Sequence, residues 1–155
     1  MRKSPSWENF SDKKASSRPH KPFIETRERV RYSETDQMGV AHNKNYLEWF
    51  EIGRTEFCRQ KQIPYKDIEA QGYYLVVVEA FCKYKKPLKY DQEFLVRVTL
   101  EDVSPKKVIF TYELLTKKEK MPIASGYTIH IVTNAEARVC SLPNHILNRL
   151  KSSEV

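Results

Sequence analysis

The most chemically suggestive stretch of the sequence is a turn-rich segment, residues 33–43. Asp36 and Gly39 stand at the first and last places of a possible type I turn. An aspartate in such a place commonly accepts hydrogen bonds from its own backbone. A carboxylate can also activate water or attack an electrophilic carbon directly. Spacing alone favours the structural role for Asp36, so its function depends on the elements around it.

Cysteines and histidines offer no further centre of reactivity. The three cysteines, Cys58, Cys82 and Cys140, are scattered and form no Cys-x-x-Cys pair. This arrangement signals neither a structural zinc site nor a redox dithiol, and it fits a reducing cytoplasm. The four histidines show no metal-ligand spacing. We therefore expect no metal and no cofactor.

Charged side chains gather at two other places. Four lysines, Lys83, Lys85, Lys86 and Lys89, crowd one predicted turn, where they are either solvated or available to hold phosphates. Glu51 precedes Arg54, and Glu56 precedes Arg59, at i, i+3 spacing on a predicted helix. These pairs predict intrahelical ion pairs, although the role of Glu51 stays open.

Length and composition indicate one globular domain. The chain has 155 residues, of which 40% are hydrophobic, and its net charge is +7. Residues 1–22 hold six Lys or Arg and two Asp or Glu, so the remainder carries only +3. We expect residues 1–22 to be a basic, flexible extension and residues 23–150 to form the domain. No apolar run is long enough to span a membrane.

Hydrophobic periodicity outlines an α+β domain. Residues 23–32 alternate like a strand, and Tyr32 completes one face. Apolar residues from Tyr46 to Phe57 recur at helical spacing, and Asn43 or Asn45 is expected to cap that helix. Four more strands are expected within 73–85, 94–101, 108–114 and 127–133, and short helices within 64–70 and 143–150. This order predicts an antiparallel β-sheet wrapped around one long central α-helix.

Two apolar surfaces suggest that the domain has a partner. The predicted helix is apolar over much of its circumference, since Leu47 and Ile52 lie off the main stripe. The strand around Leu75–Val78 is apolar on both faces. A second buried face on a small sheet is typical of a homodimer.

The segment 31–56 resembles the hotdog-fold acyl-CoA thioesterases. It reads Y-S-E-T-D, then G-V, then N-Y, then E-I-G-R-T-E, and K-P-L-K-Y-D follows at 86–91. These motifs are similar to those of the 4-hydroxybenzoyl-CoA thioesterase superfamily, in particular its Tol-Pal-associated acyl-CoA thioesterase branch. The resemblance spans roughly residues 23–150. It implies a hotdog fold and hydrolysis of an acyl- or aroyl-CoA thioester to the free acid and CoA.

The resemblance assigns the catalytic carboxylate to Asp36, as nucleophile or general base. A thioester has a thiolate leaving group with a thiol pKa of about 8.5, so no strong general acid is needed. The positive end of the helix can polarise the carbonyl, and we expect the N–H of Asn43, or of a close neighbour, to do so. The branch places a histidine where Asn43 stands, and His42 comes one residue earlier.

Other residues are weaker candidates for the site. We expect substrate contacts from Tyr32, Gly39, His42, Tyr46, Glu51 and Lys86. The resemblance also implies an active site between subunits of a homodimer or homotetramer. CoA itself belongs to the substrate.

Two other functions compete with hydrolysis. Hotdog hydratases and dehydratases act on enoyl thioesters through an Asp-x-x-x-x-His pairing, but Asp36 and His42 are one residue too far apart for it. The second alternative is a non-catalytic acyl-CoA-binding protein. Nucleic-acid binding is not expected, because most of the excess charge lies in the N-terminal extension.

Overall fold

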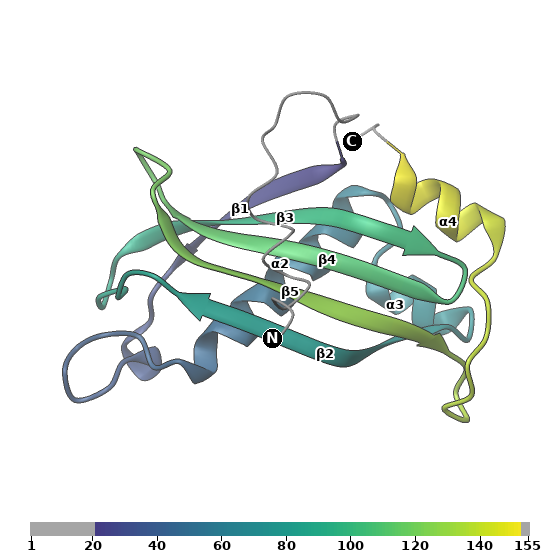
Figure 1. Cartoon of the computed structure of the whole chain (residues 1–155), viewed down its shortest axis with the longest axis horizontal. Coiled ribbons are helices and arrows are strands. Elements are labelled where there is room, and N and C mark those ends of the chain that lie inside the picture. The colour runs from purple at the N-terminus through teal and green to yellow at the C-terminus, as the bar shows by residue number, and fades with distance from the viewer. Residues whose placement is uncertain (1–20, 153–155) are drawn as a thin grey trace, which may run out of the picture.

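The strands predicted from alternating residues assemble into one antiparallel sheet. The computed structural model describes residues 21–152, and the predicted N-terminal extension lies almost wholly outside them. The strand order is β1-β3-β4-β5-β2 (Figure 1). The strands are β1 (Phe23–Arg29), β2 (Tyr74–Tyr84), β3 (Glu93–Ser104), β4 (Lys107–Thr116) and β5 (Pro122–Thr133).

The long helix α2 (Lys44–Gln60) packs against one face of this sheet (Figure 1). Its apolar stripe, which includes Trp49, Phe50 and Phe57, is fully buried. The Phe50 ring stacks on Tyr112 of β4 with 4.3 Å between ring centroids. The expected fold, an antiparallel sheet curved around one central helix, is therefore confirmed.

Three short helical segments complete the architecture. A 3₁₀ turn, η1 (Tyr32–Glu34), follows β1, and α3 (Tyr65–Ala70) follows α2. Helix α4 (Asn144–Lys151) packs at the end of the sheet opposite the loop that precedes α2 (Figure 1). Both α3 and α4 agree with the sequence pattern. Within residues 21–152, no helix has the length and apolarity needed to cross a membrane.

Two local predictions are wrong. Tyr32 does not complete a strand face: β1 ends at Arg29, the chain turns into η1, and Tyr32 is 78% exposed. Neither Asn43 nor Asn45 caps α2 with its side chain. Asn43 already has helical backbone angles (φ −57°, ψ −28°), whereas a capping residue usually has an extended backbone. The Nδ1 atom of His42 instead accepts a hydrogen bond from the Lys44 N–H at 3.1 Å.

The two edges of the sheet differ in character. Edge strand β1 carries alternating charged residues, as in the sequence FIETRER. The opposite edge strand, β2, has the sequence YLVVVEAFCKY. Its side chains Val76, Val77 and Val78 are 42%, 42% and 58% exposed. An unpaired, apolar strand edge is a site where further chains can add.

Candidate functional site

The turn that carries Asp36 is held by its own carboxylate. Asp36 Oδ1 accepts hydrogen bonds from the N–H groups of Met38 at 2.8 Å and Val40 at 3.3 Å. The Gly39 N–H donates to the Asp36 carbonyl at 3.0 Å, and Gly39 has a φ of +75° that favours glycine. Asp36 therefore does have the structural role that its spacing suggested. Oδ2 accepts no hydrogen bond from residues 21–152 and remains open to water.

Backbone contacts tie this turn to its neighbours. Thr35 pairs with Ala41, and Val40 pairs with Lys89 in the loop that precedes β3. The Ala41 N–H also donates to the Leu88 carbonyl at 2.7 Å. Asp36 directly follows Thr35, the residue that pairs with Ala41. Asp36 is exposed in the single chain.

A hollow of about 350 Å³ opens beside the start of α2. It is lined by Ala41, Asn43, Tyr46, Tyr84, Lys85, Lys86 and Pro87. The three segments that form it are the end of the Asp36 loop, the first turn of α2 and the end of β2. The structure therefore brings together three of the residues predicted from sequence, Asn43, Tyr46 and Lys86. Asp36 itself does not line the hollow within one chain.

The walls of the hollow combine aromatic and positive groups. The Tyr84 hydroxyl donates to the Asn43 carbonyl at 3.4 Å, and the Tyr84 ring meets Tyr46 edge-on at 4.7 Å. Burial raises the pKa of both phenols, so both keep their protons at neutral pH. Lys85 and Lys86 add two positive charges, and the lining includes no acidic residue. Such a hollow suits a polar ligand that carries negative charge.

Asn43, at the start of α2, lines this hollow, and its backbone N–H makes no hydrogen bond to the described residues. The Asn45 and Tyr46 N–H groups donate to the carbonyls of His42 and Asn43, and the Lys44 N–H donates to the His42 ring. An amide at the positive end of a 17-residue helix can stabilise negative charge on a carbonyl oxygen.

The remaining candidate residues lie outside the hollow. Gly39 belongs to the Asp36 loop, residues 35–41, and His42 directly follows it, where its ring caps α2 as described above. The Glu51 side chain is 66% exposed and lies 4.0 Å from Arg54, so it forms the expected intrahelical pair. The Tyr32 ring packs edge-on against Tyr90 at 5.6 Å.

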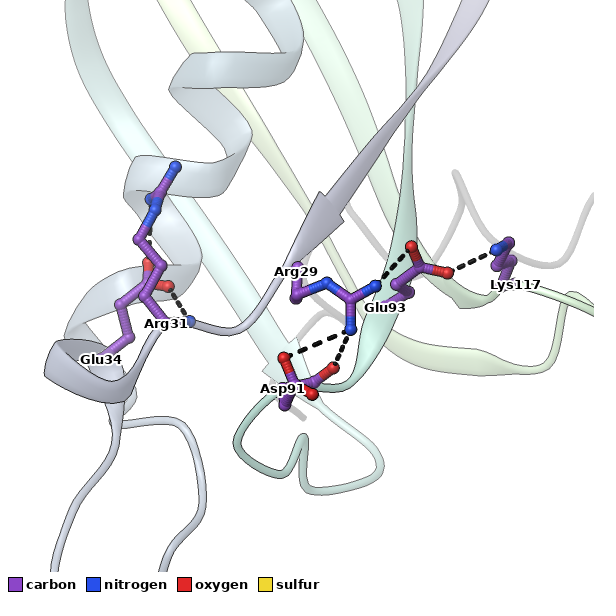
Figure 2. A network of polar contacts seen from close by, with 6 residues as sticks. All are labelled: Arg29, Arg31, Glu34, Asp91, Glu93 and Lys117. Carbon is purple, nitrogen blue, oxygen red and sulfur yellow. Dashed lines mark hydrogen bonds and ion pairs between the residues drawn. The ribbon is translucent and has the colours of Figure 1, made fainter.

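A second hollow, of about 420 Å³, lies between β1 and the loop before β3. Arg29, Asp91 and Glu93 in its lining are already in ion pairs, as Figure 2 shows. The Arg29 guanidinium donates to the Asp91 carbonyl at 2.6 Å and to Glu93 Oε1 at 2.8 Å, and Lys117 pairs with the same Glu93. Three acidic residues in the lining balance its three arginines. The hollow therefore has less to offer an anionic ligand than the one beside α2.

Tyr84 and Lys85 are not among the individual residues predicted for the site, although Lys85 is one of the four crowded lysines. They enter it because β2 pairs with β5, which sets Tyr84 opposite Ala124, and because the N–H groups of Lys85 and Lys86 both donate to the Ile123 carbonyl. The crowded lysines were the only signal in the sequence. Among residues 21–152, no group of three His, Cys, Asp or Glu side chains could hold a metal ion.

Comparison with known proteins gives a consistent family. The model of the thioesterase-like superfamily matches residues 30–150. A Bacillus subtilis protein named "Putative acyl-CoA thioesterase YneP" is 35% identical over 108 residues, which cover 70% of this chain and 78% of the relative.

Solved structures give the same result. The crystal structure of a hypothetical protein from Aquifex aeolicus is 36% identical, with a TM-score of 0.77, and the match covers 83% of this chain and 99% of that one. A DHNA-CoA thioesterase from Staphylococcus aureus is 28% identical, with a TM-score of 0.73, over 77% of this chain and 80% of that one.

Proposed function

Because the chain belongs to the thioesterase-like superfamily, we propose that it hydrolyses an acyl- or aroyl-CoA thioester to the free acid and CoA. The observation that carries the proposal is the presence, within residues 36–43, of two groups that make no hydrogen bond to the described residues. One is Oδ2 of Asp36, and the other is the Asn43 N–H at the start of α2. Thioester hydrolysis needs both kinds of group, an oxygen that starts the attack and a donor that stabilises the resulting oxyanion.

Asp36 can start the reaction in two ways. As a general base, it takes a proton from water, and the water oxygen attacks the thioester carbon. As a nucleophile, its own oxygen attacks that carbon, and water then hydrolyses the resulting anhydride. In both cases the C–S bond breaks and CoA leaves as a thiolate, while the Asn43 N–H donates to the carbonyl oxygen. Lys86, at the rim of the hollow, is proposed to contact the phosphates of CoA.

We further propose that the active enzyme is a homodimer, or a tetramer built from such dimers. Two features support this proposal: Asp36 is exposed in the single chain, and β2 leaves an apolar edge unpaired. A second copy that pairs along β2 would cover Val76, Val77 and Val78. It would also supply the remaining wall of the substrate site next to Asp36.

The decisive experiment replaces Asp36 with Asn and follows release of free thiol from a panel of acyl-CoAs. We expect kcat to fall by about 10²- to 10⁴-fold, because Asn can neither take the proton nor attack. Asp91→Asn is the matched control, since Asp91 is an exposed aspartate in the neighbouring loop and its φ of 66° suits Asn. Near wild-type activity in the Asp36 variant would refute the proposal.

The same panel separates hydrolysis from hydration. With crotonyl-CoA, a hydratase removes the enoyl absorbance without releasing thiol, whereas a thioesterase releases thiol. A non-catalytic binder does neither. Short aliphatic, long aliphatic and aromatic thioesters in the panel then define the acyl group.

A further inference from the structure

Glu34 is a buried acid whose carboxylate is fully engaged. Its residue is only 7% exposed. Oε1 accepts a hydrogen bond from the Arg31 backbone N–H at 2.7 Å, which Figure 2 shows beside α2. Oε2 accepts from the indole Nε1–H of Trp49 in α2 at 2.9 Å. The Arg31 guanidinium also lies 3.7 Å from Oε2. The Arg31 N–H directly precedes η1 and Trp49 lies in the core, so the carboxylate joins η1 to the long helix.

The backbone of Glu34 makes a second connection. Its carbonyl oxygen accepts hydrogen bonds from the His42 N–H at 2.8 Å and from the Asn45 side-chain amide at 2.7 Å. The same Asn45 amide donates to the His42 carbonyl at 3.0 Å. Glu34 therefore fastens both ends of the Asp36 loop, residues 35–41, to the first turns of α2.

Bonds within the loop and to the segment before β3 fix the shape of the loop, whereas the bonds of Glu34 join it to α2. The loop residues 36–39 are exposed, so packing gives them little restraint. A buried carboxylate is costly unless it is fully hydrogen-bonded, and this one receives two short bonds from rigid donors. Asp36, the proposed source of the attacking oxygen, lies two residues after Glu34. Asn43, the proposed oxyanion donor, directly follows His42, whose N–H donates to the Glu34 carbonyl.

We infer that Glu34 is a positioning residue for the reaction. Its carboxylate holds the Asp36 loop at a fixed distance and angle from the amide at the start of α2. The inference rests on the proposed role of Asp36 as the attacking carboxylate. Glu34 does not contact the substrate and takes no part in proton transfer.

The primary test is Glu34→Gln, which keeps the size of the side chain. Glutamine offers one acceptor and one donor, but both of its positions face N–H donors. One hydrogen bond is therefore lost whichever way the amide turns. We expect kcat to fall by about 10- to 100-fold, since small misplacements of reacting groups cost that much, and KM to change by less than about threefold.

A second substitution separates positioning from simple loss of stability. Trp49→Phe removes the indole donor, so in the double variant Glu34→Gln/Trp49→Phe the glutamine can bond to the Arg31 N–H without opposing a second donor. We expect kcat of the double variant to be about equal to that of Glu34→Gln, because the connection from η1 to α2 is already broken in the single variant. If Glu34 only stabilises the fold, the lost packing of Trp49 adds to the defect, and kcat falls further.

The control and a substrate-free readout complete the design. Leu147→Ala destabilises α4, at the far end of the sheet, and should leave kcat unchanged at a temperature where every variant is folded. Amide exchange is measured for the N–H groups of Asp36, Gly39 and His42, which are bonded across the loop. In Glu34→Gln we expect their exchange to quicken by about tenfold or more while core amides of α2 are unchanged.

The outcomes distinguish this inference from the proposed function. If Asp36→Asn is inactive and Glu34→Gln keeps wild-type kcat, the positioning role is overturned and the proposed function stands. If Asp36→Asn stays active, the proposed function fails, and the inference that depends on it fails for that separate reason. Fast loop exchange together with low kcat, and no further fall of kcat in the double variant, supports the inference.

Discussion

Among single residues, His130 shows how the core determines a charge state. It is fully buried on β5, where Nε2 shares a hydrogen bond with Thr128 Oγ1 at 2.8 Å and Nδ1 lies 3.4 Å from the Leu75 carbonyl. Burial and the nearby Arg54 guanidinium lower the pKa of His130 to about 4, although the Leu75 carbonyl opposes the shift. His130 is therefore neutral in the folded protein at pH 7 and serves the core.

This lowered pKa predicts a loss of stability in mild acid. Between pH 6.5 and about pH 4 the unfolded chain binds a proton at His130 and the folded chain does not. The free energy of unfolding should therefore decrease as the pH falls through this window, by up to about 1.4 kcal/mol per pH unit from this group. Urea denaturation at several pH values should show a shallower decrease in His130→Gln. Identical slopes for the two proteins would contradict the prediction.

The contact between α2 and β3 depends on the lack of a side chain at Gly53. A Cβ at this position would lie 2.5 Å from Val98 Cγ2 and 2.8 Å from Val96 Cγ1. Gly126 on β5 is equally constrained, because a Cβ there would meet the Phe81 carbonyl oxygen and the Phe50 ring. Glycine at these two places lets the helix and the edge strand approach the sheet.

Alanine at Gly53 should destabilise the protein even though alanine favours helices. We expect a loss of about 1–3 kcal/mol in the free energy of unfolding, because overpacking outweighs a propensity gain of about 1 kcal/mol. Denaturant titrations should show a smaller loss when the same change is made in a Val98→Ala background, which gives the new methyl group room. An equal loss in both backgrounds would rule out the clash as the cause.

The elements that the sequence predicts well are those defined by local patterns. The stripe from Tyr46 to Phe57 and the alternation in β3 and β4 need no distant contact to be recognised, and Gly72 ends α3 with a φ of +90°. The candidate site is harder to predict. Asp36 follows from a family resemblance and Asn43 from its place at the start of the helix, and their catalytic roles stay predictions.

Residue roles that depend on partners far apart in the chain could not be predicted from the sequence. Tyr84 reaches the hollow only because β2 pairs with β5. Nothing local in the sequence distinguishes Glu34 from the other acidic residues, because its partner Trp49 lies 15 residues away. The error at Tyr32 has the same origin. Alternation continues in the sequence, but the chain has already been turned into η1 by the bond between Glu34 and the Arg31 N–H.

At the scale of the whole molecule, assembly should depend on β2 and not on β1. Val78→Glu places a charge in the middle of the apolar edge, where Val78 is 58% exposed. We expect this variant to sediment as a monomer and to lose thioesterase activity while keeping its fold. Phe23→Glu is the control, because Phe23 is 53% exposed on the opposite edge and its loss should leave a dimer. A dimeric, fully active Val78→Glu protein would exclude β2 as the interface.

The difference between the two sheet edges also limits how many copies of the chain can join into one sheet. When two copies pair along β2, the unpaired apolar edge of each copy is covered. The outermost strands of the joined sheet are then both β1. Their alternating arginines and glutamates are a poor template for another strand. With an apolar edge on one side and a charged edge on the other, the chain can pair with one copy of itself without extending into a fibre.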